Sequence, residues 1–182
     1  MALAAGQGQA TTLPLKDVTI TASYQGDPSG MQGVSHQYGP GPGSNIDTID
    51  PAGLAEPEFI TSDFNFIVDF AENGLLTVYN NAPITPGAYT MRFDFGATLG
   101  AALTSYTLVD AGTIGGLPLL TLLNGNTIGL DLSGVTWEGP DGFGSFSVQL
   151  AAAAVPEPAS AALLLAGLSA LALARRKAKP LN

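Results

Sequence analysis

Cysteine is absent from the 182-residue chain, and histidine occurs once, at His36. The absence of cysteine excludes a disulfide framework, a thiolate metal site and a cysteine nucleophile. His36 lies in a stretch rich in glycine and proline, whereas a Ser-His-Asp triad needs a histidine held by rigid neighbours. The G-x-S-x-G, H-E-x-x-H and phosphate-cradling glycine motifs are missing as well. We therefore expect no catalytic residues and a chain that is not an enzyme.

Basic residues are scarce before Pro156, where Lys16 and Arg92 stand against 14 acidic residues, a net charge of −12. This balance argues against nucleic acid as a partner, because phosphate contacts need clustered Lys and Arg. Most of the acidic side chains are expected to serve solubility. A polysaccharide hydrolase would need only two carboxylates at a set separation. Their spacing along the chain predicts no such pair among the candidates, Glu56, Glu58, Glu72 and Glu138.

A run of Ala and Leu with two serines and one glycine occupies residues 159–174 and carries no charge. As an α-helix it would be about 24 Å long, which is short against a hydrocarbon core of about 30 Å. The basic residues at 175–179 can snorkel to the head groups and extend the span. By the positive-inside rule they stay in the cytoplasm, so the chain before Pro156 lies outside it. We expect a transmembrane helix at 159–174 and not a core helix, which would show a polar face.

Three features follow one another in residues 155–182: the segment Val155-Pro156-Glu157-Pro158, the apolar run, and the basic stop Arg175-Arg176-Lys177. This arrangement resembles the PEP-CTERM sorting signal. The resemblance implies that an exosortase, a membrane transpeptidase of Gram-negative bacteria that make exopolysaccharide, recognises the tail. It also implies export, an intermediate anchored in the inner membrane, cleavage at or near 155–158, and delivery to the cell surface or extracellular matrix. The LPxTG motif of sortase substrates is absent.

Residues 1–10 read MALAAGQGQA and end in the small-x-small pattern Gly8-Gln9-Ala10, which is typical of a signal-peptide cleavage site. They lack a basic start and a full apolar core. We expect them to be the end of a signal peptide that begins upstream of Met1, with an ordinary N-terminal segment as the alternative.

Residues 11–154 show the period-2 alternation of half-buried strands and no helical period. Phe64, Phe66, Val68 and Phe70 should share one face of a strand, and Asn73-Gly74 predicts a hairpin after it. The chain is therefore expected to be all-β, an antiparallel β-sandwich or jelly roll followed by a single C-terminal hydrophobic helix. The expected strands are 13–24, 59–70, 75–79, 88–95, 103–110, 117–123, 127–132 and 143–150, and 127–132 leads through Ser133-Gly134 into 135–137.

Residues 25–57 contain so many glycines and prolines that a long loop is expected, and loops of this length are functional or mobile. Within it, Asn45, Asp47 and Asp50 offer the hard oxygen ligands that calcium prefers. The EF-hand spacing is absent, and Asp and Asn also cap ordinary turns. We therefore expect no cofactor, with calcium as the alternative.

Trp137 precedes a turn at 138–142, where an indole could stack on a sugar ring, but large aromatic side chains are mostly buried and core packing is favoured.

The expected function is that of an exported surface or matrix protein with a structural or adhesive role linked to exopolysaccharide. The first alternative is a carbohydrate-binding module, and the second is a polysaccharide hydrolase. The expected partners are an exosortase, the membrane before processing, and exopolysaccharide.

Overall fold

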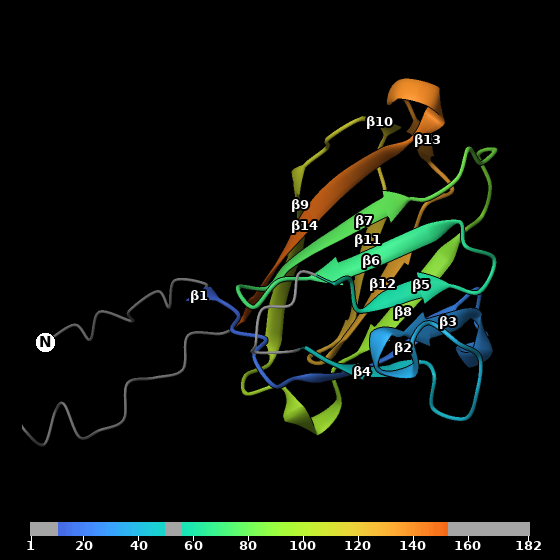
Figure 1. Ribbon diagram of the computed structural model, residues 1–182. Helices are drawn as coiled ribbons and strands as arrows, with labels where there is room; N and C mark the ends of the chain where they lie inside the picture. Colours follow the sequence, from blue (N-terminus) through green and yellow to red (C-terminus); the bar gives the residue numbers. More distant parts are fainter. Residues whose placement is uncertain (1–10, 50–55, 153–182) are drawn as a thin grey trace, which may run out of the picture.

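The computed structural model describes residues 11–49 and 56–152, in which all regular elements are strands and short 3-10 turns. The strands pair antiparallel throughout this part of the chain and form two main sheets that pack on one another (Figure 1). The prediction of an all-β, antiparallel body is thereby confirmed. The helix expected at 159–174 lies outside the described residues.

Sheet A has the strand order β1-β14-β7-β6-β5-β3, and β9 also pairs with β14. Its strands are β1 (Thr11–Thr12), β3 (Met31–Gly33), β5 (Phe59–Thr61), β6 (Phe66–Phe70), β7 (Leu75–Asn80), β9 (Leu103–Asp110) and β14 (Gly144–Ala152).

Sheet B has the strand order β11-β12-β8-β2-β4. Its strands are β2 (Thr19–Tyr24), β4 (Ile46–Thr48), β8 (Thr90–Asp94), β11 (Leu119–Asn124) and β12 (Thr127–Asp131). A small third sheet pairs β10 (Ile114–Gly116) with β13 (Val135–Trp137), at the top of Figure 1. Four 3-10 turns complete the list: η1 (Pro28–Gly30), η2 (Val34–His36), η3 (Gly96–Thr98) and η4 (Pro140–Gly142).

The core lies between the two sheets and is rich in phenylalanine. Phe70 of sheet A packs edge-on against Phe93 and Phe95, with ring centroids 5.2 and 5.8 Å apart, and both of these side chains are fully buried. Phe59 of sheet A contacts Phe93 as well, at 6.3 Å. The alternation seen in residues 88–95 therefore has its physical basis here, since every second residue of β8 faces this core.

The segment expected as one strand at 59–70 is two strands, and Phe64 is 55% exposed instead of sharing the buried face of Phe66. A turn separates β5 from β6. Asp63 stabilises it by accepting hydrogen bonds from the Thr61 hydroxyl (2.7 Å) and the Asn65 amide (3.1 Å). Phe64 has a φ of +59° in this turn, so its side chain points away from the sheet.

Two other expectations change in detail. Strand β2 begins at Thr19, because Asp17 takes a φ of +61° and interrupts the segment expected at 13–24. Residues 25–57, expected as one long loop, include the short strands β3 and β4 and the turns η1 and η2. The glycines and prolines limit these elements to three residues each but do not prevent pairing. The described part has fourteen strands where about eight were expected.

Candidate binding site

The outer face of sheet B carries an open groove of about 400 Å³, called here the sheet B groove. Its lining includes Ser23, Arg92, Leu119, Thr121, Leu123 and Asp131. These side chains alternate with the core residues of the same strands, because successive residues of a strand point to opposite faces. The groove is therefore a direct product of the alternation that also builds the core.

Four residues form a row straight across sheet B at the middle of the groove. Ser23 of β2 lies opposite Arg92 of β8, Arg92 lies opposite Gly129 of β12, and Gly129 lies opposite Thr121 of β11. Gly129 has no side chain, so the floor is low between Arg92 and Thr121. A Cβ at this position would meet Leu123 and Thr121 at 3.7–3.8 Å, which is ordinary van der Waals contact.

The groove combines a cation, hydroxyl groups and an apolar wall. Arg92 has a side chain that is 55% exposed and stands 4.0 Å from the Asp94 carboxylate. Leu119 and Leu123 are 64% and 50% exposed on the opposite side. Guanidinium and hydroxyl groups hydrogen-bond to polar ligands while leucine side chains contact apolar faces. The arrangement suits an extended ligand with both polar and apolar surface.

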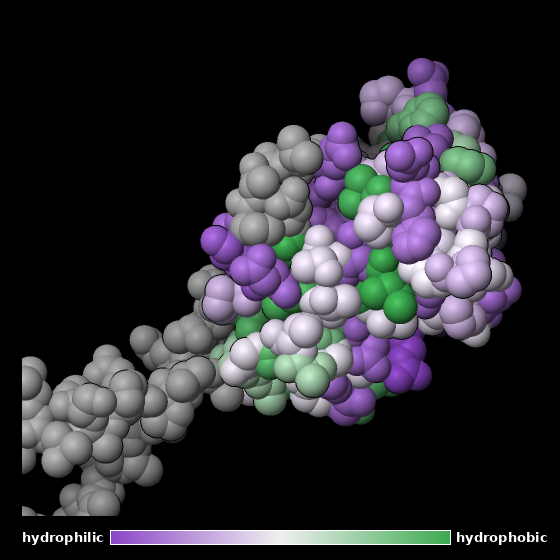
Figure 2. Space-filling model, turned by 60° about the horizontal axis from the view of Figure 1, so that its bottom comes forward, coloured by the Kyte–Doolittle hydropathy of each residue, from purple (hydrophilic) through white to green (hydrophobic). Residues whose placement is uncertain are grey.

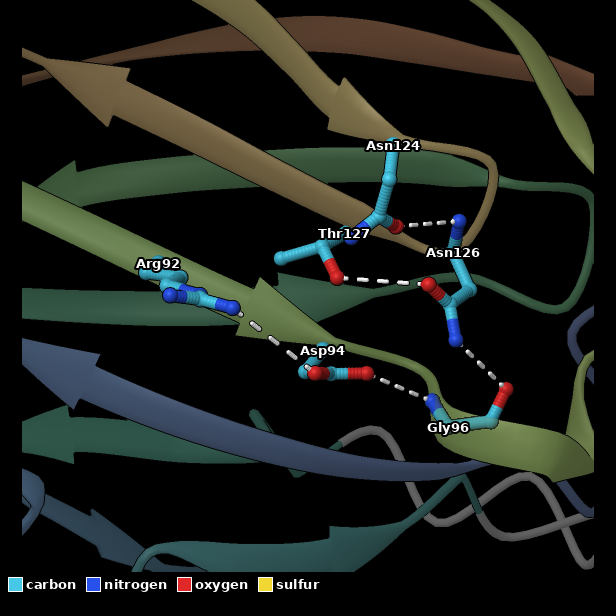
Figure 3. Close-up of polar contacts among 6 residues, drawn as sticks. All are labelled: Arg92, Asp94, Gly96, Asn124, Asn126 and Thr127. Atoms are coloured by element: carbon cyan, nitrogen blue, oxygen red, sulfur yellow. Dashed lines mark hydrogen bonds and ion pairs between the residues drawn. The ribbon is translucent and has the colours of Figure 1, made fainter.

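A set of polar contacts fixes the β11–β12 hairpin against the end of β8 (Figure 3). The Asn126 side-chain amide donates to the Gly96 carbonyl at 3.1 Å and its oxygen accepts from the Thr127 hydroxyl at 3.3 Å. Asn124 accepts from the Asn126 backbone amide at 2.9 Å, and Asp94 accepts from the Gly96 amide at 2.8 Å. These bonds hold two groove-lining strands in place at one end.

A second polar cluster lies beside the start of β5 and the end of β6, at the end of this strand pair away from the Asp63 turn. The Glu58 carboxylate is 6% exposed and accepts a hydrogen bond from the Phe70 amide at 2.6 Å. Burial raises the pKa of Glu58 to about 7; the Phe70 hydrogen bond opposes this shift, and Asp69 and Asp47 add to it. Burial also raises the pKa of Asp69 and of Tyr38. Glu58 is thus a carboxyl group that changes its charge near neutral pH.

Two of the three residues named as calcium ligands, Asn45 and Asp47, lie in the described part, where both side chains make hydrogen bonds within the fold. Asp47 is 5% exposed and its carboxylate accepts from the backbone amides of Ser35 (3.0 Å) and Thr48 (2.8 Å). Asn45 donates from its side chain to the Ala22 carbonyl at 3.0 Å. Asp50 lies outside the described residues. Within 11–49 and 56–152, no three His, Asp or Glu side chains gather as a metal site.

Trp137 is half-buried and packs against the core. Its ring lies 5.9 Å from that of Phe66 and 6.2 Å from that of Phe146. Trp137 thus makes the core contacts that the sequence predicts for a large aromatic side chain. Trp137 is not among the residues that line the sheet B groove.

The other chemical candidates are dispersed. His36 is exposed, with its Nδ1 3.2 Å from the Ser35 hydroxyl. Among the candidate carboxylates, Glu58 is buried in the cluster described above, while Glu56, Glu72 and Glu138 are exposed in separate loops and turns.

Sequence reasoning missed the sheet B groove. A signal was present in residues 119–123, Leu-Leu-Thr-Leu-Leu, because a strand with apolar residues on both faces is either central or has an unusual exposed surface. No sequence pattern predicts that Ser23, Arg92 and Thr121 lie in one row, because this row depends on the order of strands that are far apart in the chain.

The sorting residues Val155–Pro158 and the basic stop Arg175, Arg176 and Lys177 lie outside the described residues, as does the expected signal-peptide end at 1–10. Among the helical turns of residues 11–49 and 56–152, none is long and apolar enough to cross a bilayer.

Comparison with known proteins identifies the tail. The family model of the PEP-CTERM protein-sorting motif matches residues 154–178. No curated protein and no solved structure matches the chain. The C-terminal end therefore carries a PEP-CTERM protein-sorting motif, which supports an exported protein that an exosortase processes through a membrane-anchored intermediate.

Proposed function

We propose that this chain is an exported, non-catalytic protein with a structural or adhesive role in an exopolysaccharide matrix at the cell surface. The observation that carries the proposal is the PEP-CTERM motif at residues 154–178, directly after an all-β body that ends at β14. The tail resembles the PEP-CTERM sorting signal, and this resemblance implies a bacterium that makes exopolysaccharide. The acidic body favours solubility outside the cell and disfavours adsorption to anionic lipid.

The role is tested in the native host with the gene deleted and then restored. The deletion should weaken retention of cells in the matrix, and the intact chain should restore it. A chain whose Pro156-Glu157-Pro158 is replaced by alanines should not restore it, because it is not sorted. If the deletion leaves the matrix and cell attachment unchanged, the structural or adhesive role is wrong.

A second candidate, carbohydrate binding by the body, is favoured by the sheet B groove. The row from Ser23 to Thr121 offers hydroxyl groups and the Arg92 guanidinium along an open channel, and these groups can hydrogen-bond to the hydroxyl groups of a polysaccharide.

The groove allows a sharp experiment at Gly129. Gly129→Gln places a long side chain on the groove floor and should abolish binding of the host exopolysaccharide, whereas Gly129→Ala makes only ordinary contacts and should retain it. Trp137→Ala serves as the second control, since Trp137 lies outside the groove lining. Equal binding by the Gln and Ala variants would show that the groove is not the site.

A further inference from the structure

The outer face of sheet A carries a row of polar side chains that crosses four strands, called here the sheet A row. Asp69 of β6 lies opposite Thr77 of β7, and Thr77 lies opposite Ser147 of β14. Ser147 in turn lies opposite Asp110 of β9. The hydroxyl oxygens of Thr77 and Ser147 are 3.0 Å apart. The residues that flank the row in β6, β7 and β14 are buried in the core, so the row faces outward, away from sheet B.

Asp69 is the half-buried carboxylate of this row. No group of residues 11–49 and 56–152 donates a hydrogen bond to it, and the ion pair in this part of the chain, Arg92 with Asp94, lies on sheet B. Burial raises the pKa of Asp69, and its neighbour Glu58 is acidic as well. A partly buried carboxylate without a partner gains most from a cationic hydrogen-bond donor.

The charge of the whole row is negative. At its other end Asp110 is exposed, and its carboxylate accepts a hydrogen bond from the Gly112 amide at 2.8 Å. The two basic residues of the described part are Lys16, which precedes β2, and Arg92, which lines the sheet B groove. Neither belongs to a strand of sheet A. Charge complementarity therefore indicates a cationic partner for this face.

An apolar and aromatic stripe runs beside the polar row. Ile67 of β6 lies opposite Tyr79 of β7, and Tyr79 lies opposite Ser145 of β14. Tyr79 is 40% exposed, and Phe143, two residues before Ser145, is 44% exposed. Figure 2 shows hydrophobic residues reaching the surface between hydrophilic ones on the face turned forward in that view. Exposed aromatic rings present flat apolar surface for stacking, and their faces attract cations.

The spacing of the row favours a glycan over a peptide. Neighbouring strands are about 4.8 Å apart, whereas an extended peptide presents side chains on one side only about every 6.6 Å. An extended chain of β-linked sugars advances by nearly the strand spacing with each ring. Successive rings can therefore meet successive groups of the row, from Asp69 to Thr77 and Ser147.

We propose that the outer face of sheet A binds a polysaccharide whose sugars carry free, protonated amino groups. One amino group donates to the Asp69 carboxylate, the hydroxyls of Thr77 and Ser147 hydrogen-bond to the sugar hydroxyls, and a sugar ring packs on Tyr79. The inference rests on the proposed matrix role for the class of ligand. It uses the face of the sandwich opposite to the sheet B groove, so the two surfaces can be tested separately.

A glucosamine hexamer with free amino groups is the probe, and titration calorimetry on the full chain in a mild detergent measures its affinity. Asp69→Asn removes the charge and should weaken binding by at least about tenfold. Tyr79→Ala keeps the charge and should weaken it about two- to fivefold. The matched control is Asp17→Asn, which removes the same charge from an exposed position before β2 and should bind as the wild type does.

Two further probes define the ligand. The fully N-acetylated hexamer has no charge and should bind at least about tenfold more weakly, and polygalacturonate should not bind. Equal affinity for the two hexamers, or no binding of the amino hexamer by the wild type, would overturn the proposal. Polylysine that binds more tightly than the amino hexamer would also overturn it, because the face would then suit a basic polypeptide.

The variants also locate the site. Gly129→Gln fills the sheet B groove and should leave binding of the amino hexamer unchanged. Loss of binding in Gly129→Gln, or equal binding by Asp69→Asn and Asp17→Asn, would show that sheet A is not the site. The measurement uses purified protein and needs no sorting. Failure here with a clear effect of gene deletion would leave the matrix role standing, whereas binding without a deletion effect would overturn the matrix role alone.

Discussion

Glu58 is a buried carboxyl group, and it links the stability of the fold to pH. Its pKa in the folded protein is raised from 4.5 to about 7, chiefly by burial. A carboxyl with a raised pKa binds its proton more tightly in the folded chain than in the unfolded chain. The folded state is therefore favoured below about pH 4.5 and loses this advantage as the pH rises to about 7.

We predict that Glu58→Gln raises the free energy of unfolding at pH 8 by about 1–3 kcal/mol, because the charged carboxylate is no longer buried. The amide oxygen can still accept the Phe70 hydrogen bond. The gain should vanish near pH 4.5, where Glu58 is protonated in the folded protein. Urea unfolding across this range, with exposed Glu72→Gln as the control, measures the difference. Parallel pH profiles for wild type and Glu58→Gln would contradict the account.

Trp137 is predicted to act through packing. Trp137→Ala removes the ring that contacts Phe66 and Phe146, and it should lower the free energy of unfolding by about 2–4 kcal/mol. Phe143→Ala changes an aromatic residue that is 44% exposed, and it should cost less than about 1 kcal/mol. The two variants are compared by denaturant unfolding. If the Trp137→Ala protein is as stable as Phe143→Ala, the packing role is wrong and Trp137 is again a candidate for binding at the surface.

At the scale of elements, the turn between β5 and β6 depends on Asp63. Its carboxylate accepts from the Thr61 hydroxyl, the Asn65 amide, the Asn65 side chain and the Tyr24 hydroxyl, at 2.7–3.1 Å. Asp63→Ala removes both carboxylate oxygens, and with them all four hydrogen bonds, and should destabilise the fold by about 1–2 kcal/mol. Asp63→Asn keeps one acceptor oxygen and should recover part of the loss. Thermal unfolding of both variants gives the comparison, and an Asp63→Ala protein with wild-type stability would show that the turn forms without this side chain.

The same turn shows what sequence could and could not predict. Alternation placed Met91 and Phe93 correctly on the buried face of β8, because burial on one face depends on neighbours two residues apart. The period continued through Phe64 by coincidence, and the Asp63 hydrogen bonds that reverse the chain leave no trace in the hydrophobic pattern. The hairpin turn at Asn73-Gly74 was predicted correctly, because Gly74 takes a φ of +82° that glycine favours and the Asn-Gly pair marks it in the sequence.

Sheet order lay beyond sequence reasoning for a different reason. The residues of β11 predict a strand, but its place at an edge depends on pairing with β12 and on the position of β8 between β12 and β2. Such long-range order decides which apolar residues are exposed. The row of side chains along the sheet B groove therefore became visible only in the folded chain.

At the scale of the whole molecule, charge is divided between the body and the tail. The chain before Pro156 has two basic residues, and the tail has four. The tail matches a sorting motif at 154–178, and the body ends with β14 at Ala152, directly before it.

We predict that alanines in place of Pro156, Glu157 and Pro158 hold the protein in the membrane. The change removes the segment that the exosortase is expected to recognise and leaves residues 159–182 in place. Fractionation of the native host should find the wild-type chain at the surface or in the matrix and the variant with the inner membrane. Identical distributions would mean that the motif is a spacer and not a processing site.

The mass of the mature protein tests the central claim most directly. The protein is recovered from the surface or matrix of its native host and its intact mass is measured. The account predicts a form that ends at or near Pro158 and lacks residues 159–182. A surface form that still carries Arg175, Arg176 and Lys177 would contradict exosortase sorting and leave a permanent C-terminal anchor in its place.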